Sequence, residues 1–317
     1  MIDFLLLGTG GMVPLPHRWL SSLVVRCRGD LTLFDCGEGT QIAWRAGGWN
    51  LRRLSSIFLS HTHADHVAGL PGLLHAIANA DRAEPVDIYG PAGTAEVVAG
   101  LRTIAPDLPF TVTVIELVDG DRVDLTHGLS ASVRAGEHGL PSLIYRLDLP
   151  RARRFAPEWA RELGIPVDRW HDLQEGRSVT GAAGPVLPGE VLGPHRSGLA
   201  FAYVTDTRPL ADFPSFLAGV DLLVCEGTYG DSTDLPKAIA RGHMTFAEAA
   251  SLARASSAGA LWLTHFSPAL TDPDACLPQA TAVFPATTIG HAGLTTTLNF
   301  SDDKRARVAE TATFRDS

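Results

Sequence analysis

The sequence has few cysteines, no long apolar run and no excess of positive charge. Its four cysteines are widely spaced and form no C-x-x-C pair, so we do not expect a disulfide framework. We expect reduced thiols in a cytoplasmic protein. No stretch approaches the length of about 20 apolar residues that a membrane helix needs. The first residues, MIDFLLLGTGG, lack a positively charged n-region, and we expect them to form a strand and not a signal peptide.

The missing positive charge bears on possible partners. The formal net charge is −9 at pH 7, whereas proteins that bind RNA through general electrostatics are usually basic. A basic patch can still coexist with an acidic remainder. Carboxylates that bind metal also raise the acidic count, although the metal neutralises them locally.

The 317 residues allow two average domains or one large α/β unit. Short β-rich runs, such as 3–8, 22–27 and 31–37, alternate with helical stretches, such as 67–80 and 245–257. Between 149 and 198 this alternation stops. We therefore expect one domain over 1–317, of layered α/β class, with an inserted arm at 149–198.

Segment 60–66 is the clearest indication of chemistry. It places four possible metal ligands within six residues: His61, His63, Asp65 and His66. His61 and His63 are two residues apart, so at the end of an extended strand their side chains face the same side. Asp65 and His66 follow before the predicted helix and can reach the same cleft. Imidazole nitrogens and carboxylates are ligands that zinc selects, so the segment predicts a metal site and not a loop of solvated histidines.

This pattern, H-x-H-x-D-H, resembles the signature of the metallo-β-lactamase superfamily. Residues 34–41 (FDCGEGTQ) and 63–74 (HADHVAGLPGLL) resemble more specifically the ribonuclease Z family of tRNA 3′-processing endonucleases. The resemblance implies an αββα sandwich with an inserted arm and two Zn²⁺ per chain, although such ligands also accept Mn²⁺ or iron. The implied ligands are His61, His63 and His138 on the first ion, Asp65, His66 and His265 on the second, and Asp206 bridging both.

The distant members of this set have local support in the sequence. His138 lies in a loop after the predicted strand 129–135, and Asp206 and His265 follow the apolar runs 200–205 and 260–264. Polar residues at strand ends meet at one edge of a sheet in α/β proteins. Asp35, also at a strand end, fits a role in accepting an N–H from a ligating histidine; its alternative is a turn-forming residue before Gly37.

Cleavage of a phosphodiester also needs a proton for the leaving oxygen, a task that suits histidine. His243 precedes a predicted helix, lies outside the ligand set and matches a ribonuclease Z histidine, although His-Met-Thr stands here in place of His-Ser-Thr. Glu226 resembles the acidic partner that would keep His243 protonated. Asp65 could accept a proton from the attacking water. The alternative for His243 is a residue that only precedes the helix cap at Thr245.

Two segments depart from the family pattern. The substrate loop, P-x-K-x-R-N in the family, reads PLPHRW at 14–19, so Arg18 is kept while Pro16 and Trp19 replace the lysine and the asparagine. The arm lacks the family's Gly-Pro pair within 163–176, and its charges balance over 148–198, with RARRF at 151–155 as the basic cluster. This arm could grip phosphates, or it could be a solvated insertion or a dimer contact. The other cationic candidates are Arg52 and Arg53.

Three functions follow. The leading hypothesis is a zinc-dependent endoribonuclease that removes the 3′ trailer of precursor tRNA. The alternative keeps the site but acts on small phosphodiesters, esters or lactones. The third is a non-catalytic metal- or RNA-binding module. Seven ligands and a candidate acid argue against it, because such a module does not need them. The resemblance also implies a homodimer, and no membrane partner is expected.

Overall fold

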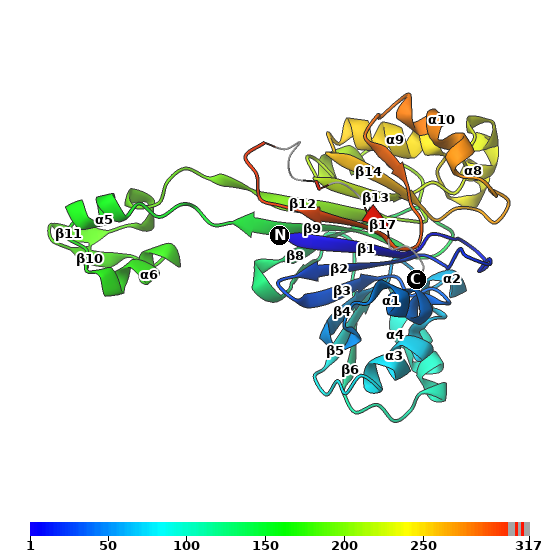
Figure 1. The fold of residues 1–317 in the computed structure, drawn as a ribbon, viewed down its shortest axis with the longest axis horizontal. Helices are drawn as coiled ribbons and strands as arrows, with labels where there is room; N and C mark the ends of the chain where they lie inside the picture. Colours follow the sequence, from blue (N-terminus) through cyan, green and yellow to red (C-terminus); the bar gives the residue numbers. More distant parts are fainter. Residues whose placement is uncertain (304–307, 310–311, 314–317) are drawn as a thin grey trace. The chain divides into compact units, whose positions relative to one another are not determined.

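Alternate side chains of the first strand, β1 (Ile2–Gly8), belong to two different cores. Phe4 and Leu6 lie in one buried cluster, and Leu5 and Leu7 lie in another. A strand that is apolar on both faces must be covered on both. The computed structural model, which describes residues 1–303, 308–309 and 312–313, accordingly contains two sheets packed face to face, each covered by helices on its outer side (Figure 1).

The strands form two large sheets. In spatial order, the first sheet contains β17 (Ala312–Thr313), β16 (Leu294–Leu298), β1, β2 (Ser22–Cys27), β3 (Asp30–Phe34), β4 (Leu54–Phe58), β5 (Val86–Gly90) and β6 (Val112–Glu116). The second contains β15 (Thr287–Ile289), β14 (Ala260–Thr264), β13 (Leu222–Glu226), β12 (Arg196–Val204), β9 (Leu143–Arg151), β8 (Ser130–Ala135) and β7 (Arg122–Asp124).

Strand direction determines where the ends of the strands meet. β3 to β6 are parallel to one another, and so are β12 to β15, whereas β1, β2 and β3, and likewise β7, β8 and β9, pair antiparallel. Parallel neighbours end at the same sheet edge. Side chains that follow β3 and β4, or β12 to β14, are therefore close in space.

Helices cover both outer faces. Against the first sheet lie α1 (Thr40–Gly47), α2 (Ala64–Val67), α3 (Leu70–Ala78) and α4 (Thr94–Leu101); with the second sheet are α7 (Phe213–Phe216), α8 (Leu235–Arg241), α9 (Phe246–Ala255) and α10 (Leu277–Thr281). Between the sheets, Phe201 meets Phe4 and Phe34 edge-on, with ring centroids 4.9 and 5.7 Å apart. The predicted αββα sandwich is confirmed.

The single helix expected over 67–80 is wrong. The chain forms α2 and then α3, with a break at Ala68 and Gly69. Pro71 lies in the first turn of α3, and a proline there cannot continue a preceding helix because it lacks the N–H and its ring clashes one turn back. Gly69 also packs against the chain beside β3, where an added Cβ would lie 2.2 Å from the carbonyl oxygen of Gly37. The break lets α2 present Asp65 and His66 separately from the longer helix.

Contacts divide the chain into two units: unit 1 is Met1–Leu149 with Leu199–Ser317, and unit 2 is Pro150–Gly198. Unit 2 contains α5 (Pro157–Glu162), α6 (Trp170–Gln174) and the hairpin β10 (Val179–Gly181) and β11 (Gly184–Val186). Its own small core consists of Ala160, Ile165, Leu173, Val179, Val186 and Val191. The extent of the inserted arm, 149–198, stays a prediction. Among the described residues, no helix is long and apolar enough to cross a membrane.

Candidate metal centre

The polar residues of the site follow the carboxyl ends of parallel strands. Asp35 follows β3 and His61 lies three residues after β4; across the interface, Asp206 follows β12, Glu226 ends β13 and His265 follows β14. All five side chains are almost completely buried. The sandwich thus brings together residues that are up to 230 positions apart in the sequence.

Three of these residues have left-handed backbone. Asp35, Asp206 and His265 have φ values of 54°, 49° and 58°. For a residue with a Cβ this conformation costs about 1–2 kcal/mol. Such strain persists only where surrounding contacts impose it, and it is concentrated at functional sites. Here it turns each chain sharply at the strand end, where the side chain enters the site.

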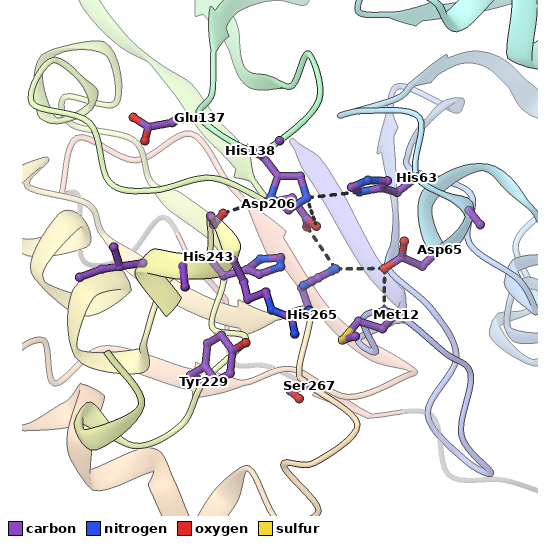
Figure 2. A pocket seen from close by; sticks show the side chains of 16 residues that line it. Met12, His63, Asp65, Glu137, His138, Asp206, Tyr229, His243, His265 and Ser267 are labelled. Carbon is purple, nitrogen blue, oxygen red and sulfur yellow. Dashed lines mark hydrogen bonds and ion pairs between the residues drawn. The ribbon is translucent and has the colours of Figure 1, made fainter. Parts of the chain in front are cut away.

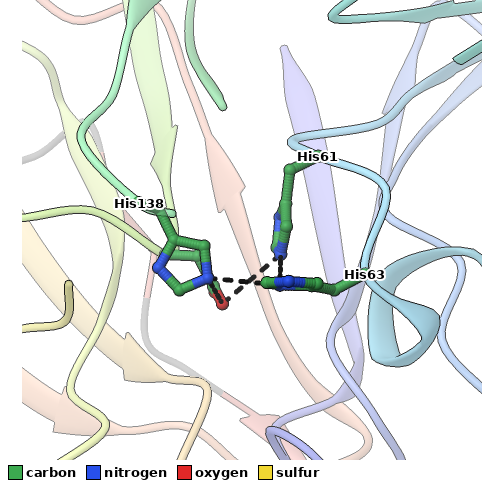
Figure 3. A group of neighbouring side chains, drawn as sticks. His61, His63 and His138 are labelled. Carbon is green, nitrogen blue, oxygen red and sulfur yellow. Dashed lines mark hydrogen bonds and ion pairs between the residues drawn. The ribbon is translucent and has the colours of Figure 1, made fainter. Parts of the chain in front are cut away.

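The first group of possible ligands is formed by three histidines. Nδ1 of His63 lies 2.9 Å from Nε2 of His61 and 3.2 Å from Nε2 of His138, so three ring nitrogens converge on one point (Figure 3). An oxygen of Asp206, Oδ2, lies 3.6 Å from Nε2 of both His61 and His138. The four donor atoms lie within 4.8 Å of one another.

The second group shares Asp206. Nε2 of His66 lies 3.2 Å from Nε2 of His265, and Oδ2 of Asp65 lies 3.6 and 3.5 Å from these nitrogens. Asp206 reaches this group through its other oxygen, Oδ1, at 3.4 Å from His66 and 3.1 Å from His265. The structure therefore brings all seven predicted ligands together in two groups with Asp206 between them. Their assignment as ligands stays a prediction.

Partners outside the two groups fix the histidine tautomers in the first sheet. Nδ1 of His66 lies 2.7 Å from Oδ2 of Asp35, which can only accept. The hydroxyl of Ser60 donates to the same oxygen at 2.9 Å and so can accept the Nδ1–H of His61 at 3.0 Å. Tyr203 also donates to Asp35, at 3.0 Å. Both histidines are thereby left with a lone pair on Nε2.

Hydrogen-bond partners also orient the two histidines that come from the second sheet, His138 and His265. The hydroxyl of Thr228 donates to Glu226 at 2.6 Å and can accept the Nδ1–H of His265 at 3.0 Å. Nδ1 of His138 lies 3.2 Å from the carbonyl oxygen of Gly242. Four histidines thus turn Nε2 toward the centre, whereas His63 turns Nδ1. Facing nitrogens that all carry lone pairs repel one another unless a proton or a cation lies between them, so the donor set fits divalent metal ions.

The electrostatics favour these forms at His61, His138 and Asp206, whereas at His66 burial, which would lower the pKa, is outweighed by Asp206 and Asp35, which raise it well above its usual value. Burial lowers the pKa of His61 well below its usual value, and burial also lowers the pKa of His138. Burial alone would raise the pKa of Asp206, but His265 and His66 hold the pKa of that carboxyl well below its usual range. Neutral imidazoles beside an ionised carboxylate are the forms that bind metal.

His243 lies beside both groups but has a different partner. Its Nδ1 lies 3.1 Å from Oε2 of Glu226, which also accepts the backbone N–H of Met244 at 3.1 Å. Burial would lower the pKa of His243, but Glu226 raises it to about 9. Its ring centroid is 4.8 Å from that of His138 and 5.4 Å from that of His265. The predicted acid and its carboxylate partner therefore meet at the edge of the metal-ligand groups.

An open pocket of about 760 Å³ leads to these residues. Figure 2 shows Met12, Tyr229 and Ser267 on its wall beside His243 and His265. Arg241, at the end of α8, also lines the pocket and is the only arginine or lysine there among the residues that the structure describes.

Two of the predicted cationic candidates have other partners. Arg18 donates to the carbonyl oxygens of Leu270 and Thr271 at 2.7 and 3.2 Å, and Arg53 pairs with Asp30 at 2.8 Å. Arg52 lines a separate cavity of about 240 Å³. Neither Arg52 nor Arg53 lines the pocket of the site, and the exposed Arg241 does.

Several residues of the site were missed in the sequence. The backbone N–H of Met12 donates to Asp65 at 2.6 Å, and the hydroxyls of Ser60, Tyr203 and Thr228 orient the ring and carboxylate groups. Ser60 adjoins the histidine segment and could have been noticed there. The Tyr203 hydroxyl acts across the two sheets, and the Thr228 hydroxyl reaches His265 from 37 residues away, so a single sequence gives no local signal for these contacts.

Comparison with known proteins agrees with this geometry. A family model described as anti-Pycsar protein Apyc1 matches residues 2–98, a range that includes segment 60–66. Over 304 residues the chain is 40% identical to a ribonuclease Z of Lachnoclostridium phytofermentans, covering 96% of this chain and 100% of the relative. A ribonuclease Z of Lachnospira eligens is 42% identical over 303 residues, with coverage of 96% and 100%.

Among solved structures, the human short-form tRNase Z has a similar fold. Its TM-score is 0.68 at 24% identity, with 94% of this chain and 99% of that chain covered. The near-complete coverage of relatives at about 40% identity, the shared fold and the converging histidine and aspartate groups lead to one conclusion. The chain belongs to the ribonuclease Z family.

Proposed function

We propose that the chain is a metal-dependent endoribonuclease that removes the 3′ trailer of precursor tRNA. Cleavage of the P–O3′ bond would leave a 3′-hydroxyl on the tRNA and a 5′-phosphate on the trailer. The observation that carries this proposal is the 40–42% sequence identity, over 96% of the chain, to proteins named ribonuclease Z. The two groups of histidine and aspartate donors, which a binding module does not need, support it.

The proposed cofactor is a pair of Zn²⁺ ions. The chemistry that divalent ions supply at such a site is Lewis acidity toward the phosphate and toward water. His61, His63 and His138 would hold one ion, Asp65, His66 and His265 the other, and Asp206 both. Five imidazoles and two carboxylates are typical zinc ligands, and Mn²⁺ and iron are the alternatives.

His243 is the proposed proton donor. With Nδ1 held by Glu226, its Nε2 is left to donate a proton to the leaving O3′. Glu226 is kept in place by two backbone N–H groups, from Thr207 at 2.7 Å and from Met244 at 3.1 Å. If His243 only preceded the helix cap at Thr245, it would not need a buried carboxylate partner that is itself held by two backbone N–H groups.

Two aspartates have supporting roles in the proposal. Asp65 would accept a proton from the attacking water, and the Met12 N–H would orient its carboxylate. Asp35 would orient His66 and, through Ser60, His61. Neither role needs these carboxylates to move.

The test compares three substrates with purified protein: a 3′-extended precursor tRNA, bis(p-nitrophenyl) phosphate and a lactone. We expect a single cut in the precursor, lost on chelation and in His63→Ala, and about two metal equivalents by elemental analysis. Fast turnover of the lactone with intact precursor would contradict the proposal.

One observation favours the small-phosphodiester alternative. Within the described part of the chain, Arg241 is the only arginine or lysine that lines the pocket, and Arg18 bonds the chain's own carbonyl groups. A long RNA usually needs several phosphate contacts. If the small diester is cleaved efficiently and the precursor is not, this alternative replaces the leading one.

Assembly and location are proposed on narrower grounds. The homodimer rests on the family resemblance, and mass photometry would test it. The cytoplasmic location rests on four free cysteines, three of them buried. Fractionation of the native host would test it.

A further inference from the structure

Arg208 links the loop that carries Asp206 to the loop of His138 and to the segment of His243. It follows Asp206 by two residues, and its backbone N–H donates to the carbonyl oxygen of Glu137, next to His138, at 3.1 Å. Its guanidinium group donates to the carbonyl oxygen of His243. It also makes a two-pronged contact with the carboxylate of Glu248 in α9.

The carbonyl of His243 lies in a short link between two helices. α8 ends at Arg241, Gly242 has a left-handed backbone with φ of 71°, and α9 begins at Phe246. The N–H of His243 bonds the carbonyl of Ala238 at 2.9 Å, within the end of α8. Among the described residues, the Arg208 contact is therefore the one that ties the backbone of His243 itself to the Asp206 loop.

Glu248 does not need Arg208 to cap α9. Oε2 of Glu248 accepts the N–H of Thr245 at 2.9 Å, while Oγ1 of Thr245 accepts the N–H of Glu248 at 3.3 Å, which is a complete capping box. The arginine adds a charge-assisted, planar contact to an acidic residue that is already fixed. The side chains of Arg208 and Glu248 are only 15% and 21% exposed, so solvent screens this pair less than a surface pair.

We propose that Arg208, held by Glu248, is a positioning residue that sets the distance of the His243 ring from the metal-ligand groups. Glu226 orients the His243 ring through Nδ1, and Arg208 fixes the backbone from which the ring extends. A displacement of about 1 Å at a reacting group can cost on the order of 10²-fold in rate. This inference rests on the proposed role of His243 as the acid.

The test uses the difference between two leaving groups. An O3′ leaving group needs a proton, whereas p-nitrophenolate leaves without one at neutral pH. We expect Arg208→Ala to lower kcat on precursor tRNA by about 10–100-fold, the usual effect of removing an orienting partner. KM, metal content and turnover of bis(p-nitrophenyl) phosphate should stay near the wild-type values, and Arg208→Lys should recover part of kcat.

Arg146 offers a matched control. It contacts Asp148 through two nitrogens at 2.9 Å each and donates to the carbonyls of Phe216 and Ala218 at 2.9 Å, so it has the same types of partner. Arg146→Ala should leave both substrates unaffected. Thermal unfolding of every variant identifies misfolded protein, and Glu248→Gln, which keeps the capping hydrogen-bond geometry, is the second variant if Arg208→Ala does not fold.

His243→Ala separates the two possible failures. If it slows both substrates equally, the assigned acid is wrong and the positioning role falls with it. If it slows only the precursor while Arg208→Ala slows both or neither, the acid stands and the positioning role is overturned. Loss of metal from Arg208→Ala would also overturn it, because the arginine would then support the ligands.

Discussion

Most titratable residues of the site in unit 1 are buried and held by partners far along the chain, whereas the ion pairs of unit 2 are exposed and local. The side chains of His66 and Asp35 are 31 residues apart in sequence and 0% exposed. In unit 2, Arg177 and Asp172 are five residues apart, with 56% and 25% exposed side chains.

The difference shows which charges can carry chemistry. Exposed pairs such as Arg177–Asp172 are screened by solvent, contribute little to stability and tolerate change. Buried groups keep a protonation state and a geometry only because several elements hold them. Changes in the site should therefore alter reaction and metal binding, and changes in unit 2 should alter at most the binding of a large substrate.

The strongest test of the comparison is Asp206→Ala. The change removes an oxygen from each ligand group, so we expect metal content to fall and cleavage of precursor tRNA to drop on the order of 10³-fold or more. Elemental analysis and single-turnover kinetics measure both. Asp172→Ala is the unit 2 control and should match wild type. Full metal content in Asp206→Ala would refute the shared-ligand assignment.

Asp35→Asn should have the next largest effect. The asparagine presents one acceptor to four donors: Ser60 N–H, Ser60 hydroxyl, Tyr203 hydroxyl and His66 Nδ1–H. We expect metal affinity to fall about 10–100-fold, as for other partners of ligating histidines. Competition with a chromogenic chelator gives the affinity. Tyr203→Phe removes one donor and should have a smaller effect. An unchanged metal affinity in Asp35→Asn would contradict the orienting role and favour the alternative, in which Asp35 only forms the turn before Gly37.

Replacing residues 152–195 by a short Gly-Ser linker tests unit 2 as a whole. The ends are close enough to bridge, because Arg196 donates to the carbonyl of Ala152 at 3.5 Å. We expect kcat/KM for precursor tRNA to fall roughly tenfold, about 1.4 kcal/mol, with turnover of bis(p-nitrophenyl) phosphate unchanged. An equal loss on both substrates would show that unit 2 supports the site and not only the substrate.

Arg241→Ala should have the smallest effect. Arg241 lines the pocket and is placed to meet one phosphate near the cut. Losing one contact should raise KM a few-fold and reduce the slope of log affinity against log salt by about 0.7 to 0.9. Titration of labelled precursor at several salt concentrations gives the slope. Arg122→Ala, whose side chain is 64% exposed beside Asp124, is the control. An unchanged slope would exclude a phosphate contact at Arg241.

The sequence alone determined the layers of the fold and the centre of the site. A continuous apolar run in a strand, as at Phe4, Leu5, Leu6 and Leu7, places apolar side chains on both faces and requires a sheet covered on both. The spacing of His61, His63, Asp65 and His66 is local, so backbone geometry alone predicts that they converge. The family resemblance supplied the distant ligands.

Only the tertiary structure decided how these residues are held. Tyr203 bonds Asp35 across 168 positions, and Arg208 bonds the backbone of His243 across 35. Arg18 proved to bond the chain's own carbonyls, and the expected helix at 67–80 divided at a close backbone contact. The physical reason is that spacing along the chain fixes only neighbours within a turn or a strand. Contacts between buried polar groups depend on which sheets pack together, and each such group takes whichever partner the packing brings within reach.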